Sequence, residues 1–250
     1  MIEPYFIMNN RKSLDFDIKL KQGFELILSS DDVLIETAPG LNRRLLISRD
    51  RKDDIERSLS VRMKKNRGEN IFLKFQRVGE WLKENSDYTD FYFSEIPDYF
   101  YKAVCLGSIT APKEAAGWLD FQIPFSFQPY MFKSSGAFPI SVTNGSSLNN
   151  PESYFSEPVL SFYFDAIANG SIIINGNLFQ VDKTIGKGNI TIDSTVGIAY
   201  REGGQNISKS ILITQNGYQP PKLQPGKNKF YINSAIQNLK VTPNWRRLAV

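Results

Sequence analysis

The sequence predicts a mainly β protein, with an α+β N-terminal domain, in which one helix packs on an antiparallel sheet, followed by a β-sandwich. Three observations predict this fold class. Residues 119–128 alternate strictly between apolar and polar side chains. Residues 70–82 show the spacing of one amphipathic helix. The second half of the chain contains repeated Asn-Gly pairs, which favour the tight turns of β-hairpins.

The alternating stretch is the element around which the first domain is expected to form. Its odd positions are apolar and its even positions are not, as in a strand with one face in water. Ten such residues span about 33 Å, enough to cross a small domain. Pro124 cannot donate to a ladder, so we expect an edge or a bulge there. We place the domain boundary just after this strand, giving domains 1–133 and 134–250.

The helix prediction depends on a cap and a spacing. Asn70 is a residue type that caps helix N-termini. After it, apolar residues recur at intervals of four, three and four, which places them on one face of a helix: Ile71, Phe75, Val78 and Leu82. One helix packed on a sheet is the economical architecture for residues 1–133.

Charge is distributed unevenly along the 250 residues, whose formal net charge is +4. Residues 1–133 contain 20 basic and 20 acidic residues, whereas the remainder contains 10 and 6. Within the balanced part, residues 43–67 carry 10 bases and 4 acids, and residues 84–98 carry 5 acids and no base. This mixed surface is not typical of a nucleic-acid-binding protein, and the basic segment holds no aromatic residue.

Composition excludes several kinds of chemistry. The sequence has no histidine, which removes histidine-based general bases, triads and metal sites. Its one cysteine, Cys105, lies in an apolar and aromatic run and is predicted to be a buried core residue. No stretch has the length of a membrane span or the form of a signal peptide, so we expect a product made in the cytoplasm.

A series of short segments follows one another through most of the chain: Trp81-Leu82, Phe91-Tyr92-Phe93-Ser94, Pro97-Asp98, Tyr99-Phe100-Tyr101, the strand 118–130, Val142-Thr143-Asn144-Gly145, Glu157-Pro158, Ile174-Asn175-Gly176, Ile190-Thr191-Ile192-Asp193, Leu223-Gln224-Pro225-Gly226-Lys227-Asn228 and Val241-Thr242-Pro243-Asn244-Trp245-Arg246. In this order the segments resemble the distal tail (Dit) proteins of long-tailed bacteriophages, the siphoviruses. The resemblance covers about two thirds of the chain and is weaker before residue 70.

The resemblance implies a structural hub rather than an enzyme. The N-terminal domain would assemble head-to-tail into a homo-hexameric ring, and the C-terminal domain would be a galectin-like β-sandwich. The ring would join the tail tube to the tail-tip proteins. Its partners would be the tail tube protein, a tail-associated fibre or lysin protein, and receptor-binding or baseplate proteins. The protein would act in the virion, and we expect no catalytic residue, cofactor, metal site, membrane contact or specific nucleic acid.

The charge distribution suggests one interface between copies. The basic segment of one subunit could face the acidic segment of the next, in a heterologous contact. The candidate residues are Arg43, Arg44, Arg49 and Arg51 on one side and Asp87, Asp90, Glu95 and Asp98 on the other. Pairing within one chain, or simple solvation, would leave the same pattern.

Two functions of other classes remain open from the sequence. The first is a carbohydrate-binding β-sandwich module of a host-recognition protein, with a sugar patch made by Trp245-Arg246, Tyr218 and Asn216. Trp245 directly follows the last strand and could instead fill the core. The second is a two-carboxylate glycoside hydrolase, for which Glu95 and Asp98 are the best local pair of acids.

Overall fold

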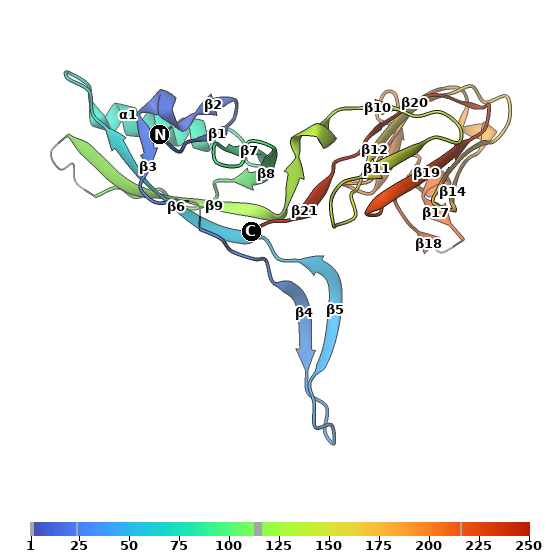
Figure 1. The fold of residues 1–250 in the computed structure, drawn as a ribbon, viewed down its shortest axis with the longest axis horizontal. Helices are drawn as coiled ribbons and strands as arrows, with labels where there is room; N and C mark the ends of the chain where they lie inside the picture. Colours follow the sequence, from blue (N-terminus) through green and yellow to red (C-terminus); the bar gives the residue numbers. More distant parts are fainter. Residues whose placement is uncertain (1–2, 24, 113–116, 216) are drawn as a thin grey trace. The chain divides into compact units, whose positions relative to one another are not determined.

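The computed structural model describes residues 3–23, 25–112, 117–215 and 217–250. The chain divides into two compact units (Figure 1). The first contains Met1–Met131 and Leu248–Val250, and the second contains Phe132–Arg247. Each unit has its own hydrophobic core. The described residues form mainly strands, so the predicted fold class is confirmed.

The first unit is built on an eight-stranded sheet. Its strand order is β2-β1-β7-β8-β9-β6-β3, and β21 also pairs with β9. The strands are β1 (Phe6–Met8), β2 (Arg11–Lys12), β3 (Ile18–Leu20), β6 (Ile55–Lys64), β7 (Thr89–Phe93), β8 (Tyr99–Val104), β9 (Trp118–Lys133) and β21 (Arg246–Leu248), with a 3-10 turn at Ser13–Phe16.

Strand β9 is the predicted alternating strand, and it is longer than predicted. It pairs antiparallel with β6 in a continuous register from Ile55↔Phe127 to Lys64↔Trp118. The register passes through Ser58↔Pro124 without interruption, so no bulge toward β6 accompanies the proline. The predicted apolar positions from Leu119 to Phe127 are all buried. Rings of this strand meet Phe91 of β7 edge-on, at centroid distances of 5.3 Å for Phe125 and 5.2 Å for Phe127.

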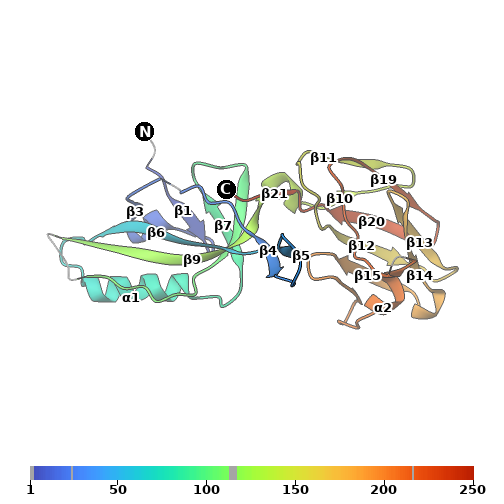
Figure 2. The same ribbon diagram turned by 90° about the horizontal axis from the view of Figure 1, so that it is seen from below.

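The predicted helix is α1 (Ile71–Leu82), which lies along β6 and β9 (Figure 2). Its cap is Asn70, whose side-chain oxygen accepts from the backbone N–H of Phe72 at 3.0 Å. The ring of Phe75 meets Phe121 of β9 edge-on at 5.2 Å. Trp81 fixes the other end of the helix by donating its Nε1–H to the carbonyl of Met8 at 2.9 Å.

Lys74 is a charged residue on the buried face of α1. Its side chain is 6% exposed and its ammonium donates to Asp17 at 2.6 Å, to Glu69 at 2.9 Å and to the carbonyl of Lys64 at 2.9 Å. Burial alone would lower the pKa of Lys74, but the hydrogen bonds to the two carboxylates raise it. The same bonds lower the pKa of Asp17 and of Glu69. The buried charge therefore ties the helix to the turn before β3.

Replacing Lys74 by methionine should destabilise the protein by roughly 2 kcal/mol at pH 7, because hydrogen bonds to charged groups are lost. The two carboxylates have ordinary pKa values of 3.8 and 4.5 that folding lowers, so they stabilise the fold above those values and lose this contribution as pH falls. The variant should therefore show a shallower loss of stability in acid. Chemical unfolding at pH 7 and pH 4 measures this, with Lys83→Met, at an exposed position, as the matched control.

The second unit is a sandwich of two sheets. One has the order β10-β20-β12-β15-β16 and the other β11-β19-β13-β14. Side chains from both sheets form one core, including Leu160, Phe162, Ile172 and Phe230. The strands are β10 (Ile140–Ser141), β11 (Ser147–Asn150), β12 (Val159–Phe164), β13 (Gly170–Ile174), β14 (Asn177–Val181), β15 (Gly188–Asp193), β16 (Ile198–Arg201), β19 (Gly226–Ile232) and β20 (Ile236–Thr242), with a separate pair β17 (Ile213–Thr214) and β18 (Gly217–Tyr218) and a one-turn helix α2 (Ser208–Ile211).

The predicted Asn-Gly hairpin joins β13 to β14. Ile174 pairs with Asn177, so the loop contains only Asn175 and Gly176. Their φ angles are +51° and +89°. Positive φ at both loop residues is what a type I′ turn requires, and the twist of this turn matches that of the two strands that it joins. Asn175 also holds β19, since its oxygen accepts from the N–H of Lys229 at 2.9 Å.

A buried carboxylate holds both ends of the second unit. Glu152 has a side chain that is 1% exposed; it accepts from Arg247 Nε at 2.6 Å and lies 3.6 Å from Lys133 Nζ. Lys133 and Arg247 lie at the two places where the chain passes between the units. The backbone N–H of Lys133 also donates to the carbonyl of Trp245 at 2.8 Å. Both crossings are thus fixed by hydrogen bonds within the second unit.

The last three residues belong to the first unit, not to the second as the predicted range 134–250 would have it. Ala249 is buried in the first core, and its N–H donates to the carbonyl of Pro129 in β9 at 2.9 Å. The hydroxyl of Tyr101 donates to the carbonyl of Val250 at 3.3 Å. The end of β9 therefore supplies a hydrogen-bonding edge and an apolar site for the C-terminus.

Candidate subunit interface

The basic residues of the predicted interface lie on a hairpin formed by β4 (Asp31–Glu36) and β5 (Leu45–Lys52). These two strands form a sheet of their own, separate from the eight-stranded sheet (Figure 1). None of the described hairpin residues belongs to either hydrophobic core. We call this element the β4–β5 arm. Residues 25–30, just before the arm, form no strand, and Phe24 lies outside the described residues.

Both faces of the β4–β5 arm carry exposed apolar side chains. Leu34 pairs with Ile47, and Ile35 pairs with Leu46; because side chains alternate along a strand, the two pairs lie on opposite faces. The four residues are 39% to 69% exposed. A lone two-stranded hairpin is marginally stable in water, and exposed apolar rows of this kind mark interaction surfaces. The arm therefore presents an apolar surface on each of its two faces.

The four arginines of the predicted interface differ in their surroundings. Arg49 and Arg51 face Asp32 of the same hairpin, with N···O distances of 3.5 Å and 2.5 Å. The hydrogen bond to Asp32 raises the pKa of Arg51. Arg43 and Arg44 lie in the connection between β4 and β5 and are exposed. Arg43 and Arg44 are therefore better placed than Arg49 and Arg51 to contact another molecule.

The acidic residues lie around β7. Asp87 precedes the strand, Asp90 is within it, and Glu95 and Asp98 lie in the connection to β8. Asp90 forms an ion pair with Lys102 at 2.5 Å, whereas the other three are exposed. Among the described ion pairs, none joins the basic set to the acidic set within one chain. The proposed contact between copies stays a prediction.

The acid pair proposed for glycoside hydrolysis has the wrong surroundings for that chemistry. Glu95 and Asp98 are both exposed in a turn. A general acid of this class needs an apolar pocket that keeps its carboxyl group protonated. Neither residue has such a setting in the structure.

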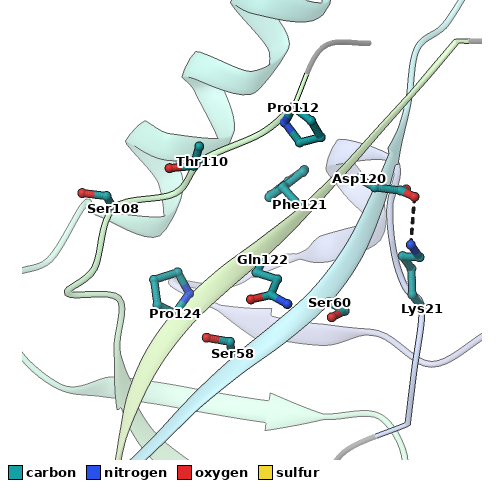
Figure 3. A pocket seen from close by; sticks show the side chains of 10 residues that line it. All are labelled: Lys21, Ser58, Ser60, Ser108, Thr110, Pro112, Asp120, Phe121, Gln122 and Pro124. Carbon is teal, nitrogen blue, oxygen red and sulfur yellow. Dashed lines mark hydrogen bonds and ion pairs between the residues drawn. The ribbon is translucent and has the colours of Figure 1, made fainter. Parts of the chain in front are cut away.

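A polar hollow of about 450 Å³ lies beside β6 and β9 in the first unit (Figure 3). Hydroxyl and amide side chains line it, among them Ser58, Ser60 and Gln122. Its carboxylate, Asp120, forms ion pairs with Arg62 at 2.7 Å and with Lys21 at 2.8 Å. These bonds hold the pKa of Asp120 well below its usual value, first through Arg62 and then through Lys21. The carboxylate is thus permanently ionised and already paired, which does not suit a general acid or base.

Among the described residues, no group of three or more Cys, Asp or Glu side chains could hold a metal ion. No described helix is long and apolar enough to cross a membrane. Cys105 is 5% exposed, and burial raises the pKa of its thiol, so it is the core residue that the sequence predicted.

The sugar patch expected around Trp245 is contradicted by burial. Trp245 and Arg246 are each 5% exposed, and Trp245 belongs to the core of the second unit. The Arg246 guanidinium lies over the ring of Phe155 at 4.8 Å and pairs with Glu157 at 2.6 Å. Tyr218 is exposed, and Asn216 lies outside the described residues. The tryptophan fills the core because it closely follows β20, which is a strand of the sandwich.

Comparisons with known proteins give matches among solved structures alone. No protein-family profile and no curated protein sequence matches the chain. The Dit (gp 19.1) protein of phage SPP1, described as a paradigm of the hub adsorption apparatus in phages that infect Gram-positive bacteria, is 12% identical, with a TM-score of 0.69 over 95% of this chain and 96% of that chain.

Two structures of the phage p2 baseplate in its activated conformation also match. The chain in the strontium-bound structure is 10% identical, with a TM-score of 0.54 over 100% of this chain and 99% of that chain. The chain in the calcium-bound structure is 9% identical, with a TM-score of 0.54 over 96% of this chain and 97% of that chain. The fold is therefore that of phage tail-hub and baseplate subunits. In particular, it is the Dit fold that the sequence segments resemble.

In the unassembled protein, the backbone amides of the β4–β5 arm should exchange hydrogen much faster than those of β6 and β9, because no core covers them. Hydrogen exchange followed by mass spectrometry measures this. The hairpin β13–β14, which has buried residues on one face, is the matched control. Equal protection of the two hairpins would show that the arm is stable by itself.

Proposed function

We propose that the protein is a structural subunit of a phage tail tip, a hub between the tail tube and the proteins of the tail tip or baseplate. The observation that carries this proposal is the fold match to the SPP1 hub protein, which extends over 95% of this chain and 96% of that one. Both units are included, so the match concerns the two-domain architecture and not one common sandwich. The surroundings of Asp120, Glu95 and Asp98 support a role without catalysis.

The first unit forms a homo-hexameric ring by a head-to-tail contact in this proposal. The β4–β5 arm has two apolar faces to bury, and it is a sheet separate from the eight-stranded sheet. A contact between two different surfaces of identical subunits closes into a ring when the rotation between them fits. Arg43 and Arg44 of one arm meet Asp87, Glu95 and Asp98 of the next subunit, which adds electrostatic specificity to the apolar contact.

The second unit, a galectin-like sandwich in this proposal, faces outward from the ring. The ring joins the tail tube protein to a tail-associated fibre or lysin protein, and the outer sandwiches meet receptor-binding or baseplate proteins. The protein acts in the virion after synthesis in the host cytoplasm. The surplus of bases in residues 134–250, 10 against 6 acids, suits acidic surfaces on these partners.

The direct test is the mass of the purified protein by light scattering, with negative-stain images of the same peak. We expect particles of six subunits with a central opening. The measurement is repeated after co-expression with the tail tube protein of the same phage. A strict monomer under both conditions would contradict the ring.

Aspartate at Leu46, on one face of the arm, should abolish assembly and leave the monomer folded. The side chain is 69% exposed in the single chain, so the change should alter the free energy of unfolding by less than about 0.5 kcal/mol. Sedimentation and chemical unfolding measure the two effects. Leu178→Asp, at a 44% exposed position in the second unit, is the matched control and should assemble normally.

Reversal of Arg43 and Arg44 to glutamate should weaken the ring and reverse its dependence on salt, because the contact between opposite charges becomes one between like charges, which salt screens. Arg49 and Arg51 are left in place, since their reversal would also break the pairs with Asp32 inside the arm. Lys227→Glu with Lys229→Glu is a control of equal charge in the second unit. A further reversal, Glu95→Arg with Asp98→Arg, should restore assembly. Unchanged assembly in the first variant would dismiss this charge contact.

A further inference from the structure

Tyr218 is an exposed aromatic residue that stands between two hollows of the second unit. Its ring is 50% exposed on the short strand β18. It lines one hollow of about 650 Å³ together with Gln205, Asn206 and Ser210. It also lines a second hollow of about 280 Å³ with Asn177 and Gln224. The larger volume lies within the range of sites that hold small organic ligands, roughly 300–1,000 Å³, and the smaller lies just below it.

The ring is held in place by its own hydroxyl group. Tyr218 Oη donates a hydrogen bond to the carbonyl of Gly197, in the turn before β16. Strand β18 pairs with β17 through Ile213↔Tyr218, which fixes the backbone of the residue. A side chain that is already immobilised loses little conformational freedom when a ligand binds it. An exposed aromatic ring fixed in this way is a preformed platform.

The side chains around the platform define the chemistry of a ligand. Neither hollow has an aspartate or glutamate among its described lining residues, which argues against a cation site. Amide and hydroxyl groups predominate, and each amide offers both donors and an acceptor. Of the two lysines present, Lys222 lies over the ring of Phe155 at 4.6 Å, so there is no paired anion clamp of the kind that binds phosphate.

We propose that Tyr218 and the surrounding amides form a binding site for neutral pyranose units of an oligosaccharide. A pyranose has one apolar C–H face, which packs on an aromatic ring, and a rim of hydroxyl groups, which exchange hydrogen bonds with planar amides. Gln205 and Asn206 contact the sugar on one side of the ring, and Asn177 and Gln224 contact a neighbouring sugar on the other side. The site spans two hollows, so it takes at least a disaccharide.

This site goes beyond the hub role and does not depend on ring formation. All of its residues lie in the second unit. It replaces the sugar patch around Trp245, whose ring is buried in the core. A glycan contact would give the tail tip a direct, weak hold on a carbohydrate surface, multiplied by the number of copies present.

The test is saturation-transfer NMR on the full chain with four probes: lactose, maltose, cellobiose and chitobiose. We expect transfer to at least one of them, reduced at least tenfold by Tyr218→Ala. Tyr231→Ala is the matched control, because this tyrosine is 48% exposed on β19 and is not among the residues that line the two hollows, and it should retain the signal. Unfolding curves of each variant establish that it is folded.

Two exposed positions provide a second measurement that does not alter the platform. Gln205→Ala and Asn177→Ala should each weaken binding, and each should reduce transfer mainly to the sugar unit in its own hollow. No transfer to any of the four disaccharides would overturn the proposal. Transfer that persists in folded Tyr218→Ala, or that is lost equally in Tyr231→Ala, would also overturn it.

Discussion

The pairing of β9 with β6 is the constraint on which the first unit depends. Ten successive residue pairs keep the two strands in one register, from Ile55↔Phe127 to Lys64↔Trp118. A shift by one residue would turn every apolar side chain of β9 toward water, so the buried rings of Phe121, Phe125 and Phe127 fix that register. Helix α1 then packs on this face through Phe75, and the backbone N–H of Ala249 donates to the carbonyl of Pro129 in the same strand.

Buried charges complete each unit and determine how its segments meet. Lys74 joins α1 to the turn before β3 and to its own N-terminal loop. Glu152 joins the first and last segments of the second unit through Lys133 and Arg247. Such groups are costly to bury: replacing a whole buried ion pair by apolar residues often costs no stability, whereas removing one partner alone does. Their effect here is specificity, since each charge accepts few arrangements of its partners.

The β4–β5 arm is a described element with exposed apolar side chains on both of its faces. Leu34 and Ile47 on one face, and Ile35 and Leu46 on the other, remain exposed. A lone two-stranded hairpin is marginally stable in water, and exposed apolar rows are typical of interaction surfaces. The arm is therefore the element on which the proposed contact between copies depends, and the fold is one that the chain shares with solved phage proteins.

The sequence by itself determined the elements whose information is local. Alternation predicted β9, the Asn70 cap and apolar spacing predicted α1, and Asn175-Gly176 predicted its hairpin. Tertiary structure decided which elements meet. It separated the arm from the main sheet, paired Arg49 and Arg51 with Asp32, buried Trp245 and returned Ala249 to the first core. Periodicity along a chain shows which face of a strand or helix is apolar, but the partner of that face depends on contacts between residues far apart in sequence.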